Sequence, residues 1–429
     1  MSKLRLGIAR SPHSFGVFKD HETDWFFKRT LEYMVEKAAE IGECLYVARR
    51  IDETDGESWI KEWAELAEKV EKAGEESLSR GHKISARESF LRASNYYRAA
   101  EYGTPPSHPR FHKLWEKSRE CFHKACPLYN PPIQIVEVPF EGKNLPGYYW
   151  RPDNTDVKRP TLIAAGGNDS SGEEVVFAGG PATVRRGYNF FTFEFPGHRG
   201  AVHLYPDCVK RPDYEVPFKA AIDFLETLPG VDERIALTGL SFGGYVAIRV
   251  AVHEPRIKAL IPNSPIIDGF RMSRAAWGPL LKRIPHFLLT RMLGWRLKKK
   301  PVMKAFFEYS LWSSGLTMPL KDILKPEIQE KTTEMQKQYT VVDDLHRIMC
   351  PALALVSEDE GEELVQQAKQ FYGNISSANK KIHIFTLDTD GSNDHCQLDN
   401  RSRGNQIAFD WLDEVFNYVY EPSPSSRDV

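Results

Sequence analysis

The chain has 429 residues, of which 41% are hydrophobic and 27% are charged, and its formal net charge is -2. This composition is typical of a folded globular protein, and the length allows one large domain and a second substantial unit. Acidic and basic residues are interspersed, so no strong field attracts nucleic acid or an anionic membrane, and we expect a small-molecule substrate instead. The sequence is also compatible with a homodimer.

The first residues, MSKLRLGIARSPHSF, lack the apolar run of a secretory signal, and no run of about 18 apolar residues could span a bilayer. We therefore expect a cytoplasmic protein. Six cysteines show neither the density of a disulfide-rich scaffold nor C-x-x-C metal spacing, and no phosphate or dinucleotide loop is present. We expect reduced thiols and neither a metal nor a cofactor; the cysteines are Cys44, Cys121, Cys126, Cys208, Cys350 and Cys396.

The first third of the chain predicts helices. Apolar residues recur at three- and four-residue steps in WFFKRTLEYMVEKAAEIGECLYVARR, SWIKEWAELAEKVEKAGEESLSRG and KISARESFLRASNYYRAAEY. A Pro-rich break, GTPPSHPR, precedes a further helix, FHKLWEKSRECFHKAC, and PLYNPP ends the helical region. Residues 1–130 therefore form a separate helical unit in our interpretation.

After residue 130 the pattern changes to strands. IQIVEVPF and GYYWRP predict a hairpin, and TLIAAGG, FFTFEFPG, RIALTGLS, KALIPNSP, ALALVS and IHIFTL alternate with helical stretches. This alternation predicts an α/β fold with a mostly parallel sheet flanked by helices over residues 131–420. Residues 269–345 show no evident strand and predict inserted lid helices. The polar end, residues 421–429, predicts a disordered tail.

The strongest chemical motif is the G-x-S-x-G sequence centred on Ser241. It follows the strand RIALT and precedes the helical stretch YVAIRVAVHE. In such a strand–turn–helix setting the serine occupies a strained turn, and small residues on either side let the backbone bend sharply. We therefore predict that Ser241 is a nucleophile.

A serine hydroxyl needs a base, and in this arrangement the base comes from the loop after the last strand. His395 lies there, in DTDGSNDHCQLDN, before a final helix. His198 and His203, in the loop EFPGHRGAVH, are second-choice bases or substrate contacts. Cys396 is an alternative nucleophile, but it lacks an exposing turn motif, and we interpret it as a buried thiol.

The group that orients His395 should be a carboxylate after the preceding strand, since it holds the imidazole tautomer. There the sequence ALALVSEDEGEE places Glu358, Asp359 and Glu360 in a row. The usual length of this strand and turn favours Glu360, but alternation does not separate it from Asp359. Asp268, after the earlier strand, is a third alternative.

Backbone amides should bind the oxyanion that forms when the serine attacks a carbonyl. One is the amide of Phe242, the residue after the nucleophile. The other belongs to AAGGNDSS after the strand TLIAA, at Gly167 or Asn168. No other feature of the sequence suggests a different chemistry.

With these residues in place, the chain resembles α/β-hydrolases with an N-terminal helical cap, a group that includes 2,6-dihydroxypseudooxynicotine hydrolase and fungal yellowish-green-type polyketide-shortening hydrolases. The resemblance rests on the helical first third, the turn GGNDSSGEE, the elbow TGLSFGGYVA and the histidine loop DHCQLDN. It implies an α/β-hydrolase fold in which residues 1–130 cap the pocket. It also implies carbon–carbon bond cleavage in β-dicarbonyl or acyl-aromatic compounds, or ester hydrolysis.

Three functional hypotheses follow. The first is a serine hydrolase that acts on a carbonyl of a polyketide-like or aromatic ketone in secondary metabolism. The second is a carboxylesterase or lactonase with the same triad. The third is a hydrolase-fold cyclase or condensation catalyst that excludes water.

Overall fold

The computed structural model describes residues 15–273, 297, 299–317, 322 and 325–420. In these ranges the chain forms an eight-stranded sheet with the order β1-β2-β4-β3-β5-β6-β7-β8. β1, β2 and β4 pair antiparallel, and every pair from β4 to β8 is parallel. The strands are β1 (Gln134–Phe140), β2 (Lys143–Trp150), β3 (Arg159–Ala165), β4 (Asn189–Phe193), β5 (Val231–Leu240), β6 (Ile257–Asn263), β7 (Ala352–Ser357) and β8 (Lys380–Phe385).

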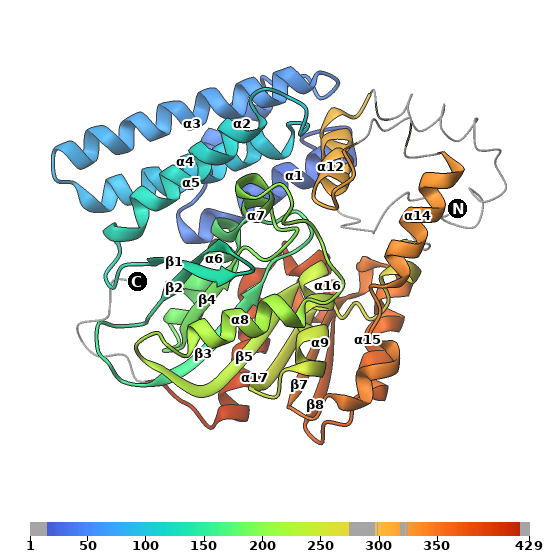
Figure 1. Ribbon diagram of the computed structural model, residues 1–429. Helices are drawn as coiled ribbons and strands as arrows, with labels where there is room; N and C mark the ends of the chain where they lie inside the picture. The colour runs from blue at the N-terminus through green and yellow to red at the C-terminus, as the bar shows by residue number, and fades with distance from the viewer. Residues whose placement is uncertain (1–14, 274–296, 298, 318–321, 323–324, 421–429) are drawn as a thin grey trace.

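Helices cover both faces of this sheet (Figure 1). Apolar side chains of α8 (Glu215–Leu225), α9 (Phe242–His253) and α15 (Glu362–Asn374) pack with one face in the largest core cluster. The opposite face packs against α6 (Gly172–Val184) and α17 (Arg401–Phe416). A strand that is buried on both faces has a continuous run of apolar residues. For this reason the sequences RIALT and ALALVS predicted β5 and β7. The predicted α/β fold with a mostly parallel sheet is confirmed.

The N-terminal helices are α1 (His21–Leu31), α2 (Ile41–Ala48), α3 (Gly56–Ser79), α4 (Lys83–Tyr102) and α5 (Phe111–Ala125). They share an apolar core rich in Trp and Tyr, and α4 and α5 also contribute to a cluster with α6 and β2. The sequence suggested one continuous helix at the start of this region. The structure instead ends α1 in a 3-10 turn, η1 (Glu32–Glu36), because Lys37 adopts a left-handed conformation with φ 61° that ends the helical hydrogen bonding.

Shorter elements connect these layers. They are α7 (Arg199–Leu204), α12 (Pro301–Trp312), α14 (Pro326–Lys337), α16 (Leu387–Asp390), η2 (Cys126–Leu128), η3 (Val342–Arg347), η4 (Glu358–Glu360) and η5 (His395–Gln397). α12 and α14 fall within the predicted insertion, and α12 contacts α1, α3 and α4. Residues 274–296 of that insertion and the predicted tail lie outside the described residues.

Candidate active site

Ser241 occupies a sharp turn between β5 and α9. Its φ of 57° and ψ of -119° lie outside the regions that L-residues prefer. The Ser241 amide donates to the carbonyl of Asn263 at 2.6 Å, and its carbonyl accepts from the Gly244 amide at 2.8 Å. A Cβ on Gly239 would lie 1.9 Å from the Gly243 carbonyl oxygen, so this approach requires glycine. The predicted strand–turn–helix setting of Ser241 is therefore present.

His395 and Glu360 meet at the carboxyl ends of β7 and β8. Nδ1 of His395 lies 3.0 Å from Oε2 of Glu360, and both residues are buried. Glu360 closes the 3-10 turn η4, where its Oε1 accepts from the Ser357 amide at 3.0 Å. The hydroxyl of Ser264, at the end of β6, donates to the same carboxylate. Glu360 is thus held at a fixed position against the histidine.

The second nitrogen of His395 faces Cys396. The distance from Nε2 to the Cys396 sulfur is 3.7 Å, and this sulfur also lies 3.3 Å from the Asn263 carbonyl oxygen. Among the described residues, no hydrogen bond joins Ser241 Oγ to His395. Burial lowers the pKa of His395, but the electrostatic and hydrogen-bond interactions with Cys396 and Glu360 act against it and raise this pKa to about 10.

The other carboxylate candidates lie elsewhere. Glu358 is exposed, and Asp359 accepts a hydrogen bond from the Asn393 side chain. Asp268 accepts from the Arg271 amide at 2.9 Å, so it caps the turn after β6. In the described part of the chain, none of these three carboxylates forms a hydrogen bond or ion pair with the candidate base.

The alternative bases are held in other contacts. His198 stacks on Phe195 with ring centroids 4.1 Å apart, and its Nδ1 lies 3.1 Å from Glu194. His203 stacks on Trp115, and burial lowers its pKa. In the ranges that the structure describes, no hydrogen bond joins either ring to Ser241.

The predicted oxyanion turn after β3 lies directly against the elbow. A Cβ on Gly167 would lie 3.3 Å from the Cβ of Ser241, so the two backbones are in close contact. The Gly167 amide donates to Ser170 Oγ at 3.0 Å. The amide of Asn168 has no acceptor among the described residues, and the Phe242 amide stands at the first position of α9, where a helix leaves the N–H unused. Of the two predicted donors, only Asn168 therefore keeps an amide without an acceptor among the described residues.

A cation that sequence reasoning missed lies beside this turn. Lys210 Nζ donates to Asn168 Oδ1 at 2.5 Å and lies 3.5 Å from the Ser310 carbonyl oxygen and 6.0 Å from the centroid of the Phe242 ring. Burial lowers the pKa of Lys210 to about 7, although the charge of Asp169 acts in the opposite direction. Lys210 belongs to no recognisable motif, so only the folded chain reveals it.

Buried ion pairs connect the N-terminal helices to the same turn. Arg29 of α1 binds Asp169 at 2.7 Å and Glu174 at 2.6 Å, and Arg98 of α4 binds the same glutamate. These pairs are nearly inaccessible to water, and the two arginines hold the pKa of Glu174 at about 2 against the effect of burial. On the other side of the site, Lys28 of α1 pairs with Asp394, the residue before the histidine.

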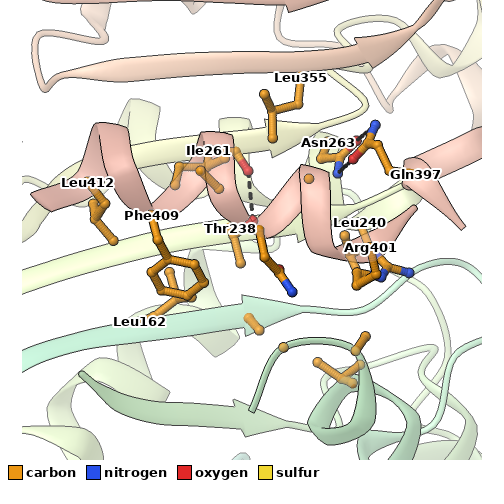
Figure 2. A pocket seen from close by; sticks show the side chains of 17 residues that line it. Leu162, Thr238, Leu240, Ile261, Asn263, Leu355, Gln397, Arg401, Phe409 and Leu412 are labelled. Carbon is orange, nitrogen blue, oxygen red and sulfur yellow. Dashed lines mark hydrogen bonds between the residues drawn. The ribbon is translucent and has the colours of Figure 1, made fainter. Parts of the chain in front are cut away.

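A small cavity lies behind the site, between the sheet and α17. Its volume is about 60 Å³, and Figure 2 shows its lining of mainly apolar side chains, with Asn263 bonded to Gln397 at one end. Substrate pockets for small organic molecules usually hold at least about 300 Å³. This cavity therefore has room for a few water molecules and not for a substrate.

In the described ranges, no group of three or more His, Cys, Asp or Glu side chains is placed to hold a metal ion. None of the helices in these ranges combines the length and apolar character needed to cross a membrane.

Comparison with known proteins identifies the family. The model of the alpha/beta hydrolase family matches residues 162–392. Hydrolase ORFZ of Pyricularia oryzae is 31% identical over 94% of this chain and 97% of its own length, and hydrolase acrC of Aspergillus aculeatus is 28% identical over 93% and 98%. The 20-hydroxy-prefusarin hydrolase of Gibberella moniliformis is 33% identical over 65% of this chain and 67% of its own length.

A solved structure shows the same architecture. The 2,6-dihydroxy-pseudo-oxynicotine hydrolase superposes with a TM-score of 0.68 over 92% of this chain and 98% of its own, at 22% sequence identity. The resemblance that the sequence motifs suggested is confirmed at the level of fold and family. This chain is a member of the α/β-hydrolase family.

Proposed function

We propose that this chain is a serine hydrolase that cleaves a carbon–carbon bond next to a carbonyl group in a polyketide-like or aromatic ketone. Ser241 is the nucleophile, His395 the base, and Glu360 the carboxylate that orients the base. The observation that carries the proposal is the 3.0 Å contact between His395 Nδ1 and Glu360, together with the strained turn of Ser241. The Ser241 amide and the Cys396 thiol, next to His395, both bind the Asn263 carbonyl. The relative named for the hydrolysis of 20-hydroxy-prefusarin supports a small organic substrate.

The reaction begins when Ser241 Oγ adds to the carbonyl carbon and gives its proton to His395 Nε2. For this step His395 Nε2 leaves the Cys396 thiol and accepts a hydrogen bond from the Ser241 hydroxyl. Sites without a bound substrate often lack this hydrogen bond between base and nucleophile. The amides of Phe242 and Asn168 bind the oxyanion. Because the interactions with Cys396 and Glu360 raise the pKa of His395 to about 10, the neutral base becomes more abundant as the pH rises toward this value.

The intermediate then collapses. The bond between the carbonyl carbon and the α-carbon breaks, its electron pair leaves as an enolate, and His395 returns the proton to this fragment. Water, activated by the same histidine, hydrolyses the acyl-enzyme and releases a carboxylic acid. Overall, one water is consumed, and one ketone and one acid are formed.

A comparison of two substrates tests this proposal. An aryl 1,3-diketone and a p-nitrophenyl ester of the same acyl group are incubated with wild type and with Ser241→Ala, and the acid product is quantified. We expect acid from the diketone and a loss of kcat of at least about 1,000-fold in the variant. Turnover of the ester alone would identify an esterase. Failure of both substrates would contradict hydrolysis and favour a cyclase or condensation catalyst.

A further inference from the structure

The position of Lys210 is tightly determined. Its amide donates to the carbonyl of Ser313 at 2.9 Å at the end of α12. A Cβ on Gly197 would lie 2.3 Å from Lys210 Cγ, so the stem of the lysine runs directly against the backbone there. Its ammonium consequently lies beside the side chains of Asn168 and Phe242, the two residues whose amides we propose as oxyanion donors.

The charge of this ammonium is not neutralised by the described residues. Its hydrogen-bond acceptors are the uncharged oxygens of Asn168 and Ser310, and no carboxylate in the described ranges lies within ion-pair distance of it. The neighbouring Asp169 is bound by Arg29. An ammonium has three donors, so one N–H remains for a ligand. Lys210 as a whole residue is half-buried, and burial of its ammonium favours the neutral amine and lowers its pKa to about 7.

The nearby arginines differ in this respect. Arg29 and Arg98 share Glu174, and Arg199 binds Glu101. These guanidinium groups are therefore neutralised within the protein, and Lys210 is the cation that remains for a bound molecule among these four. A single ammonium suits an oxygen with one negative charge, whereas a phosphate is usually bound by several donors or cations.

We propose that Lys210 binds an acidic enol or phenol oxygen of the substrate, next to the carbonyl that Ser241 attacks, and so selects substrates that carry this group. This inference rests on the proposed function, because the attacked carbonyl fixes where the second oxygen lies. In a 1,3-dicarbonyl compound the two oxygens are on carbons separated by a single carbon. Before cleavage the bound enol takes a proton on the carbon between the two oxygens, and its hydroxyl proton is lost in exchange, so that the diketone forms. When the carbon–carbon bond then breaks, the electron pair moves onto the second carbonyl oxygen, where the ammonium stabilises the enolate that leaves.

Kinetic discrimination provides the first test. The substrates are 1-phenylbutane-1,3-dione, its 2,2-dimethyl derivative, which cannot enolise, and an ortho-hydroxyaryl ketone, which distinguishes a phenol from an enol. We expect wild type to have a higher kcat/KM for the diketone that can enolise than for its 2,2-dimethyl derivative. Lys210→Met should lower the ratio of kcat/KM for the diketone that can enolise to kcat/KM for its 2,2-dimethyl derivative at least about tenfold, as expected for loss of a charge-assisted hydrogen bond. Lys210→Arg should restore part of this ratio. Lys219→Met, at an exposed position of α8, is the matched control.

A spectroscopic test separates this inference from the role of Ser241. The enolate absorbance of 1-phenylbutane-1,3-dione is titrated against pH with Ser241→Ala, which binds without needing turnover. We expect the bound diketone to ionise at lower pH than the free compound, and this shift to disappear in Ser241→Ala/Lys210→Met. An unchanged shift, or an unchanged kinetic ratio in Lys210→Met, would overturn the role of Lys210. Residual turnover by Ser241→Ala would instead contradict the proposed function.

Discussion

At the scale of single residues, Glu360 shows how the surroundings select one carboxylate from three neighbours. The Ser357 amide, the Ser264 hydroxyl and the Cys396 amide all donate to it, and the last of these distances is 3.4 Å. These donors hold the buried carboxylate in place against His395. Glu358 and Asp359 lie on the same turn but point to other surroundings.

Substitution of the acid tests this assignment. Glu360→Gln keeps the shape but presents an N–H where an acceptor is needed, so we expect kcat to fall by up to about 10,000-fold with little change in KM. Asp359→Asn and Asp268→Asn are matched controls and should lose less than about tenfold, because neither carboxylate contacts His395. Steady-state kinetics on one substrate measures all three. A nearly normal Glu360→Gln beside an inactive control would overturn the acid assignment.

At the scale of elements, α1 and α4 bind α6, the helix after the turn that follows β3, through ion pairs to Glu174, the third residue of α6. The Tyr102 hydroxyl donates to the same carboxylate at 2.7 Å. Removing one partner of a buried ion pair leaves the opposite charge uncompensated, which costs about 3–5 kcal/mol. The contact between the N-terminal helices and the catalytic core therefore depends on this glutamate.

The stability of Glu174→Gln tests this dependence. We expect the free energy of unfolding to fall by about 3–5 kcal/mol at pH 7, measured by urea denaturation. Because the folded pKa of Glu174, about 2, lies below its ordinary value, its contribution is present above about pH 4.5 and is lost as the pH falls toward 2. The difference between wild type and variant should therefore shrink in acid. The exposed Glu76→Gln is the control, and equal stability of both variants would refute the argument.

The sequence alone predicted some of the strands and site residues but not others. Strands such as RIALT and the elbow around Ser241 depend on residues adjacent in the chain, so local patterns predicted them. The identity of the acid was left open, because the chain leaves β7 in the 3-10 turn η4, where strand alternation no longer applies. Ser264 and Lys210 reach the site only when distant segments fold together, and no local pattern marks them.

At the scale of the whole molecule, the N-terminal helices contact both halves of the candidate site. Arg29 of α1 binds Asp169 in the turn after β3, and Lys28 binds Asp394 beside His395. Figure 1 shows α1 lying over the end of the sheet where these loops gather. One helix thereby ties together loops that are more than 200 residues apart in the sequence. Our central proposal for the molecule is that these loops form the active site in which Ser241 is the nucleophile.

Covalent labelling tests that claim most directly. Wild type, Ser241→Ala and Cys396→Ala are each treated with a fluorophosphonate, and intact-protein and peptide mass spectrometry locate the adduct. We predict one adduct per chain on the peptide that contains Ser241, in wild type and in Cys396→Ala, and no adduct in Ser241→Ala. Equal labelling of Ser241→Ala, or an adduct that maps to Cys396, would contradict the account.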